Sequence, residues 1–446
     1  MTPRRRTLLA AVSTATASTV AGCADLLARE TNDESGPDSP EDAATAFLED
    51  LENERFERAS ERFASDGRDR YGDPGRLERL WLGYGAVGGD FEEIAETAVT
   101  EGGSRTAVDL TLAFARGDHA CRVIVDGDSR LRNVGIADEY ERPSYVDSGA
   151  VASEDLTLAV DGCSLSGTVA TPADGEGGAP GVVLVHDSGP VTQNAARGGT
   201  QAFTDLAEGL ATQGVATLRY DKRVPACEVE PAEYTLDRVT VDDALVAIER
   251  LRGTDGVDPD RIVVVGHGFG GRAAPRIAAR DGNLAGVVGL AAPARPYHEL
   301  TLEQLEHKVS VGSHEWDDLS AVYEQWTDEI EPVRSGEYGS DEMLLGKPGA
   351  FWESLEAYDH LGTAAEIDAP LYFLQGKRDF QVSVGEDLER WQAELGDGSD
   401  ATVETYDGLD HLFMPGEKPS VEFAYFVRNN VAGDVIDDLA GWIGGL

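Results

Sequence analysis

From about residue 150 onward, short apolar runs alternate with longer segments of helical periodicity. Residues 181–185 are apolar without alternation, which is typical of a strand buried on both faces. Further runs of this kind cover 215–220, 262–265, 285–290 and 370–374. Helical patterns lie between them at 204–213, 241–251 and 272–279. This alternation predicts βαβ units and an α/β domain with a doubly wound, mostly parallel sheet.

The same domain, 150–446, contains a segment in which the alternation stops. Residues 297–361 carry helical patterns at 302–309 and 316–330, and they interrupt the sheet where a lid over a pocket would be inserted. We therefore expect a helical lid. Its apolar side chains would either line the pocket or pack the insertion against the sheet; these are Leu302, Leu305, Tyr323, Trp326 and Trp352.

Residues 41–142 follow a different pattern. Apolar positions at helical spacing cover 43–63 and 77–84, and alternating segments follow at 94–99, 106–114 and 120–125. This order predicts a small α+β domain with an antiparallel sheet, joined to the larger domain by a linker near 141–144. It contains no catalytic constellation, so we expect a docking module or a spacer.

The first 23 residues predict a targeting signal. Arg4, Arg5 and Arg6 precede an apolar run that is shorter than the roughly 20 residues a bilayer span needs, as in twin-arginine export signals. The run ends Val20-Ala21-Gly22-Cys23, which resembles a lipoprotein cleavage box with lipid attachment at Cys23; a plain secretory signal is the alternative. Residues 24–40 have the composition of a disordered tether. We expect an exported protein, lipid-anchored at the outer face of the cytoplasmic membrane.

The charge balance restricts the partners. The chain carries 83 acidic against 37 basic residues, a formal net charge of −46, and the acids are scattered. Such a surface would repel the phosphates of nucleic acid, so we expect no nucleic-acid partner. It suits a halophilic protein, because in molar salt the Debye length falls to about 3 Å and self-repulsion is screened.

Cysteine and histidine spacings give no metal signature. Cys121, Cys163 and Cys227 lie far apart without a C-x-x-C pair. Buried free thiols are the default expectation, and one disulfide between two of them is the alternative. The eight histidines show neither H-E-x-x-H nor an i, i+4 pair, so we expect no metal ion.

The chemistry concentrates at residues 261–274, where an apolar strand meets a glycine cluster and an alanine-rich helix. Gly266, Gly268 and Gly271 satisfy the dinucleotide fingerprint G-x-G-x-x-G. That motif requires an acidic residue at the end of the next strand, but 289–293 reads Gly-Leu-Ala-Ala-Pro. We therefore expect no dinucleotide and no other cofactor.

The other strand–turn–helix motif is the nucleophile elbow G-x-S-x-G, in which Gly268 would occupy the serine position. An elbow requires an acid and then a histidine on later loops. Asp379 follows the strand 370–374, and His411 follows the strand 402–406, in the required order. Singly each is an ordinary loop residue, but together with the turn they favour the elbow.

These motifs, with the segments 185–190, 218–223, 294–296 and 408–413, resemble α/β-hydrolases of the EstD-type carboxylesterase group, related to serine aminopeptidase-like and dienelactone hydrolase-like enzymes. The front domain resembles the cystatin-like domain of unknown function found in that group. The resemblance implies hydrolysis of carboxylic esters by a Ser-Asp-His triad. It would make Asp379 the orienting acid, His411 the base and Gly268 the nucleophile position. The backbone amides of Phe269 and Asp187 would be the oxyanion donors.

Two departures from the family pattern fall on the chemistry itself. Gly268 has no side chain, so no acyl-enzyme forms there. Asp187 replaces a glycine, and its carboxylate would oppose an oxyanion unless it were protonated or turned away. Ser188 is the nearest hydroxyl, but nothing in the sequence directs it at His411.

Two function classes follow from these departures. The first is a protein impaired or inactive as an esterase, which binds a small ester-like ligand in the inherited pocket. The alternative is an ester hydrolase in which Asp379 and His411 activate a water. Because an elbow normally holds serine, the sequence predicts that Gly268→Ser alone is tolerated and restores the triad.

The charge balance predicts salt-dependent stability. The melting temperature should rise steeply as KCl or NaCl increases from about 0.1 M to about 3 M, because screening removes self-repulsion. Comparing salts of equal ionic strength separates screening from ion-specific hydration. A melting temperature that stays flat over this range would contradict the screening argument.

Overall fold

A computed structural model describes residues 39–174, 177–396 and 401–446. The expected export signal, the lipid site Cys23 and nearly all of the expected tether lie outside these residues. Contacts group Pro37–Leu446 into one compact unit. Among the helices of the described ranges, none combines the length and apolar character needed to cross a membrane.

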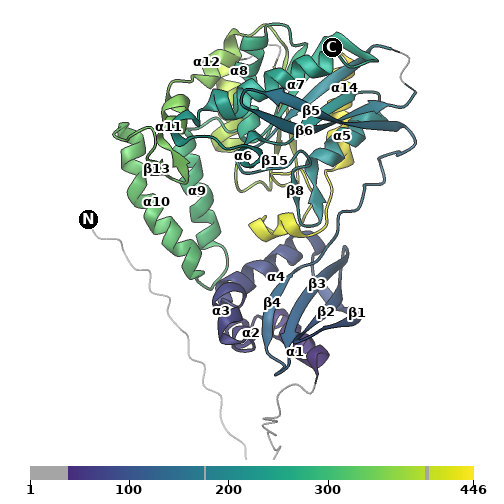
Figure 1. Ribbon diagram of the computed structural model, residues 1–446, viewed down its shortest axis with the longest axis vertical. Coiled ribbons are helices and arrows are strands. Elements are labelled where there is room, and N and C mark those ends of the chain that lie inside the picture. Colours follow the sequence, from purple (N-terminus) through teal and green to yellow (C-terminus); the bar gives the residue numbers. More distant parts are fainter. Residues whose placement is uncertain (1–38, 175–176, 397–400) are drawn as a thin grey trace, which may run out of the picture. The chain divides into compact units, whose positions relative to one another are not determined.

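The larger domain is built on an eight-stranded mixed sheet (Figure 1). The first six strands in the order below pair in parallel, and the last two pair antiparallel at one edge. The order across the sheet is β16 (Ala401–Tyr406), β15 (Leu371–Gly376), β12 (Gly286–Leu290), β11 (Val257–His267), β7 (Ala179–Val185), β10 (Ala216–Tyr220), β6 (Cys163–Pro172) and β5 (Val151–Val160). This confirms the predicted α/β fold class. The apolar runs are buried strands because helices cover both faces.

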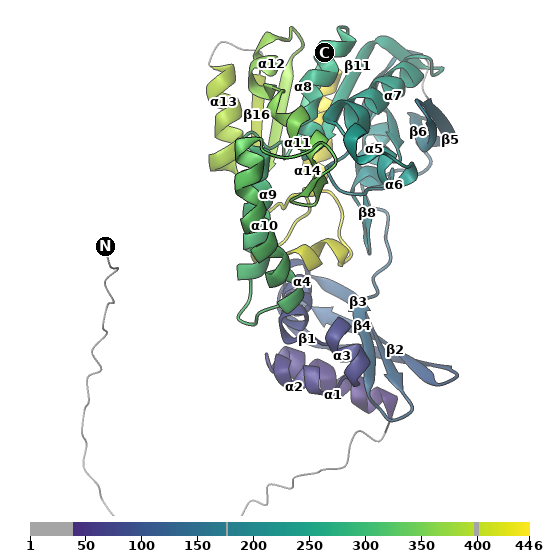
Figure 2. The same ribbon diagram turned by 60° about the vertical axis from the view of Figure 1, so that its left-hand side comes forward.

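Helices pack on the two faces in the manner of a doubly wound sheet (Figure 2). On one face, α5 (Ala202–Thr212) packs against β10 and against the last helix, α14 (Gly433–Gly444). The remaining helices of the sheet form a second group, in which each helix contacts the next. They are α7 (Asp242–Arg252), α8 (Phe269–Asp281), α12 (His360–Glu366) and α13 (Glu389–Leu395).

The expected insertion is helical. Between β12 and α12 the chain forms α9 (Tyr297–Ser310), α10 (Asp317–Ser335), a short hairpin and α11 (Gly349–Glu356). The hairpin pairs β13 (Met343–Leu344) with β14 (Lys347–Pro348). The apolar side chains Leu305 and Trp352 are buried, which is the packing role that the sequence left open for them.

The small front domain has four helices and an antiparallel sheet. The helices are α1 (Pro40–Glu52), α2 (Phe56–Glu61), α3 (Ser65–Tyr71) and α4 (Pro74–Gly88). The sheet is β1 (Phe91–Gly102), β2 (Arg105–Phe114), β3 (Gly117–Asp126) and β4 (Leu131–Ile136) in sequential order. The fourth strand was not predicted. Its short Leu-Arg-Asn-Val-Gly-Ile sequence carries little alternation.

Part of the front domain's core comes from the far end of the chain. Val421, Ala424 and Val427 are buried with the apolar residues of α1, α4 and β2. They belong to the 3₁₀ segment η4 (Glu422–Phe426) and its flanks, which pack against α4. The front domain is therefore structurally continuous with the larger one.

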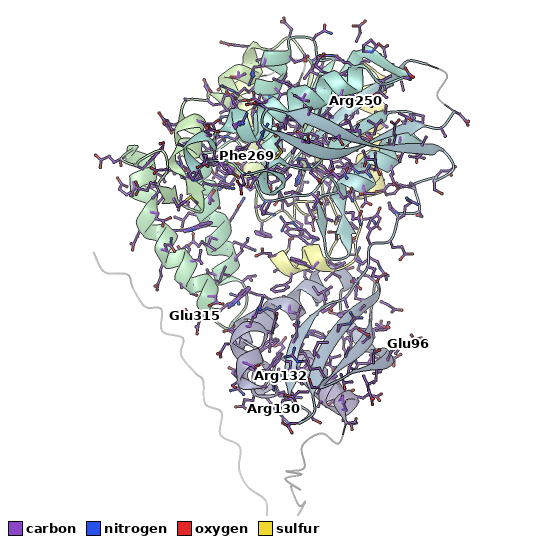
Figure 3. All side chains as sticks on the ribbon, in the orientation of Figure 1. Glu96, Arg130, Arg132, Arg250, Phe269 and Glu315 are labelled. Atoms are coloured by element: carbon purple, nitrogen blue, oxygen red, sulfur yellow. A yellow bond between two sulfur atoms is a disulfide. The ribbon has the colours of Figure 1, made fainter. Side chains whose placement is uncertain are left out.

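A second connection joins α4 to the C-terminal end of α9 and to the loop between α9 and α10. The guanidinium of buried Arg79 donates to the carbonyl oxygens of Lys308 (3.0 Å), Val309 (2.8 Å) and His314 (3.0 Å). The neighbouring Glu78 carboxylate accepts from the backbone amides of Ser313 and His314. Figure 3 labels Glu315 in this loop. The front domain thus braces the helical insertion through Arg79 and Glu78.

Two cysteines are paired. Cys163, at the start of β6, and Cys227, just after α6 (Arg223–Ala226), form a disulfide with their Cα atoms 6.2 Å apart, and Cys121 is a buried free thiol. The default expectation of free thiols is therefore wrong for this pair. Because β10 pairs antiparallel with β6, the chain that follows β10 lies near the start of β6. The two cysteines are 64 residues apart in sequence, so their proximity could not be predicted from their spacing.

The Arg79 connection predicts a stability effect. Arg79→Ala should lower the free energy of unfolding by about 3 kcal/mol, because several part-buried carbonyl groups lose their donor. Chemical denaturation in molar salt measures the change. Arg105→Ala, at an exposed position of β2, is the matched control and should change it by less than about 0.5 kcal/mol. Equal effects of the two variants would show that the brace contributes nothing.

Candidate active site

The turn between β11 and α8 has the backbone of a nucleophile elbow. Gly268 lies at φ 53° and ψ −119°, a strained conformation that side chains rarely adopt, and α8 begins at the next residue, Phe269 (Figure 3). The turn is also packed closely against its neighbours. A Cβ atom on Gly270 would lie 2.3 Å from the carbonyl oxygen of Val185. The glycines thus preserve the elbow although the serine is absent.

Asp379 and His411 are brought together on the loops after β15 and β16. The Nδ1 atom of His411 donates to the Oδ2 atom of Asp379 at 2.8 Å. The Oδ1 atom of Asp379 accepts from the backbone amides of Gln381 (2.7 Å) and Val382 (3.1 Å). The side-chain amide of Gln375 donates to Oδ2 at 3.0 Å. With four donors, Asp379 is held rigidly and orients His411.

The Asp187 side chain occupies the position that a side chain on residue 268 would need. A Cβ atom built on Gly268 would lie 2.5 Å from the Cγ and Oδ1 atoms of Asp187. A serine at residue 268 would therefore require the Asp187 side chain to shift, and the tolerance of Gly268→Ser stays a prediction. The carboxylate is also not turned away from the site.

The carboxylate of Asp187 is bound by two backbone amides. Its Oδ1 atom accepts from the backbone amide of Phe269 at 2.9 Å and from that of Ser188 at 2.7 Å. Phe269 is one of the two predicted oxyanion donors, and the role of the Asp187 amide as the other stays a prediction. The Oδ2 atom of Asp187 lies 3.5 Å from Nε2 of His411.

Two carboxylates change the protonation of His411. Burial alone would lower the pKa of its imidazole, but Asp379 and Asp187 outweigh burial and raise the pKa to about 10. Burial would raise the pKa of Asp187, yet His411, His267 and the Phe269 amide hold it well below the usual range. The raised pKa favours the imidazolium form of His411, in which Nε2 carries a proton and has no lone pair to act as a base.

Two further titratable groups lie beside the carboxylate. His267 precedes Gly268, and burial and then His411 lower its pKa to about 4. Lys222 binds the backbone carbonyl oxygen of Asp187, and burial and then Lys347 lower its pKa to about 7. Sequence reasoning assigned neither residue a role, because only the fold brings them to Asp187.

A pocket of about 70 Å³ opens onto Asp187 and His411. It has room for several waters, each of which needs at least about 10–15 Å³. Arg197 and Lys308 provide basic groups in its wall, and Phe203, Phe380 and Tyr425 provide rings. Of the insertion, Lys308 of α9 reaches this pocket, whereas the apolar candidates Leu302, Leu305, Tyr323, Trp326 and Trp352 are not in its wall.

One group of side chains in the described residues has the composition of a metal site. Asp187, His267 and His411 each offer one ligand atom, and these atoms lie within 4.8 Å of one another. No sequence motif indicates this group, because the three residues are separated by 80 and 144 positions. A sequence motif of fixed spacing identifies only metal ligands that lie on the same helix, strand or loop.

The sheet order, the elbow after β11 and the Asp379–His411 pair on successive loops define an α/β-hydrolase. A family model described as serine aminopeptidase, S33, matches residues 199–419. Esterase EstD of Thermotoga maritima is 31% identical over 404 residues, which cover 90% of this chain and 94% of EstD. The chain therefore belongs to the family of EstD, a family of carboxylic ester hydrolases.

The similar solved structures are more distant in sequence. Est1E from Butyrivibrio proteoclasticus is 14% identical with a TM-score of 0.43, covering 66% of this chain and 99% of Est1E. The hypothetical protein PA2218 from Pseudomonas aeruginosa is 16% identical with a TM-score of 0.43, covering 67% of this chain and 94% of its own.

Proposed function

We propose that this chain binds a small ester-like or carboxylate-bearing ligand in the pocket of an ester hydrolase and does not form an acyl-enzyme. One observation carries the proposal: the Asp187 carboxylate stands in the space of the missing serine side chain and is held by two backbone amides. Gly268 removes the nucleophile, and Asp187 occupies the oxyanion position.

The protonation of His411 favours binding over hydrolysis by an activated water. A general base needs a free lone pair near neutral pH. The pKa of His411 is raised to about 10, so its Nε2 atom keeps a proton that Asp187 stabilises from 3.5 Å away. Both the covalent and the water route are therefore impaired in this arrangement.

The pocket supports a ligand with a carboxyl or ester group. The two amides that now bind Asp187 are donors for a carbonyl or carboxylate oxygen. Arg197 lines the same pocket, and in the described residues its guanidinium has no ion-pair partner, although the chain is strongly acidic. An anionic group on the ligand would find its counter-ion there.

Ester hydrolysis by designed variants tests the disarmed site. With p-nitrophenyl butyrate in a buffer containing EDTA, wild type and Gly268→Ser should stay near background. Gly268→Ser combined with Asp187→Gly should exceed wild type by at least about 100-fold, a small part of the roughly 10⁶-fold that a serine nucleophile contributes elsewhere. The turnover number from initial rates measures the gain.

Adding His411→Ala to the double variant is the matched control and should abolish the gained turnover. Wild-type hydrolysis that is lost on His411→Ala would reject the proposal in favour of the water-based hydrolase. A folded double variant without turnover would show that more than these two positions separates the site from a working triad.

Ligand binding gives an independent measurement, with butyrate as the probe. Asp187→Gly should bind butyrate at least about tenfold more tightly than wild type, because the vacated amides and the histidine then bind the ligand's carboxylate instead of an internal one. Isothermal titration in molar KCl measures the dissociation constant. If Asp187→Gly leaves it unchanged, Asp187 does not occupy the ligand's position.

A further inference from the structure

We propose that Asp187, His267 and His411 form a binding site for one divalent transition-metal ion, such as Zn²⁺, at the position vacated by the serine. Each of the three side chains offers one ligand atom, and all three atoms lie within 4.8 Å of one another. Two imidazole nitrogens and one carboxylate oxygen are a ligand set that suits Zn²⁺ and its first-row neighbours. This inference concerns a different ligand from the proposed function and does not depend on it.

In each histidine one ring nitrogen is held by an acceptor outside the group of ligand atoms, which leaves the other nitrogen for the metal. The Nε2 atom of His267 lies 2.8 Å from the backbone carbonyl oxygen of His411, and a carbonyl only accepts, so this nitrogen carries the hydrogen. The lone pair of His267 is then on Nδ1. Nδ1 of His411 donates to Asp379, which directs its other nitrogen, Nε2, at the site. A second ring nitrogen held by a carbonyl or a carboxylate is the usual support of a metal-binding histidine.

An unsatisfied polar atom points to the same place. Nε2 of His411 is buried and has no hydrogen-bond partner in the described residues, and its nearest charged neighbour is Oδ2 of Asp187 at 3.5 Å. Only 3% of the His411 side chain is exposed, against 27% for Asp187. A cation between these atoms would satisfy both, and it would replace the proton now on Nε2, which passes to solvent.

The three ligand atoms lie within 4.8 Å of one another, a slightly wider group than the ligand atoms around a bound Zn²⁺ ion. Two ligand atoms on one Zn²⁺ ion, each bound at about 2.0–2.2 Å, are about 3–3.5 Å apart. The Oδ2–Nε2 separation of 3.5 Å already meets this spacing. Asp187 is the most exposed of the three and is followed by loop residues, so its side chain can close the remaining distance.

Cationic side chains near the site oppose the ion. The ammonium of Lys222 binds the backbone oxygen of Asp187, and that of Lys347 binds the backbone oxygen of Ser188. Arg197 and Lys308 lie in the wall of the same pocket. Two carboxylates act directly on the ligand atoms: Asp187 is itself a ligand, and Asp379 binds His411 at 2.8 Å. These carboxylates supply the negative charge that a cation at this position needs.

Metal titration of the full chain tests the site. After removal of bound metal with EDTA and exchange into about 2 M KCl, which screens weak binding to surface acids, the protein is titrated with ZnCl₂ by calorimetry and with CoCl₂ by visible absorption. We expect saturation at one ion per chain and a cobalt spectrum of a nitrogen- and oxygen-bound ion. The titration needs no ester and no turnover.

Two variants test the ligands, and a third serves as the control. Asp187→Asn keeps an oxygen for the two amides but loses the charge, and His267→Gln removes an imidazole; each should weaken Zn²⁺ binding by at least about 100-fold. His298→Gln, on α9 outside the site, is the control and should bind as wild type does. Circular dichroism establishes that each variant is folded. Absence of saturable binding by folded wild type, or binding that survives both Asp187→Asn and His267→Gln, would overturn the proposal.

Discussion

The contact between the Asp187 carboxylate and the backbone of the elbow determines the character of this site. It exists because residue 268 has no side chain: the Cγ and Oδ1 atoms of Asp187 lie 2.5 Å from where a Cβ atom would stand. Two amide donors bind the carboxylate, and its other oxygen faces His411. The two departures from the family pattern therefore fall on positions that contact each other.

The front domain contacts chain segments that lead to the pocket. The loop after β16 that carries His411 continues into the segment 421–427, whose apolar residues are buried in the front domain. The same domain grips the α9–α10 loop through Arg79 and Glu78, and α9 supplies Lys308 to the pocket wall. The front domain thus contacts the two segments that border the pocket, so that its removal would disturb the site as well as the surface.

The sheet and the Asp379–His411 pair were predictable because their signals are local. Buried parallel strands leave continuous apolar runs, and loops after such strands meet at one edge of the sheet. The orientation of Asp187, the Cys163–Cys227 disulfide and the approach of His267 to Asp187 were not predictable. Each depends on side chains from distant elements and on a rotamer that sequence does not determine. The same limit applies to Val421 in the front domain's core.

A second carboxylate alters what the histidine can do. In an ordinary triad one carboxylate orients a largely neutral imidazole, whose free nitrogen removes a proton from serine. Here Asp187 faces that nitrogen, and together with Asp379 it raises the pKa of His411 to about 10, so a positive charge is stable where a base would have to be neutral. A proton or a metal ion can supply that charge. Under the proposed function, adding a hydroxyl at residue 268 would not by itself restore a base, because the Asp187 carboxylate that contacts residue 268 also stabilises the imidazolium of His411.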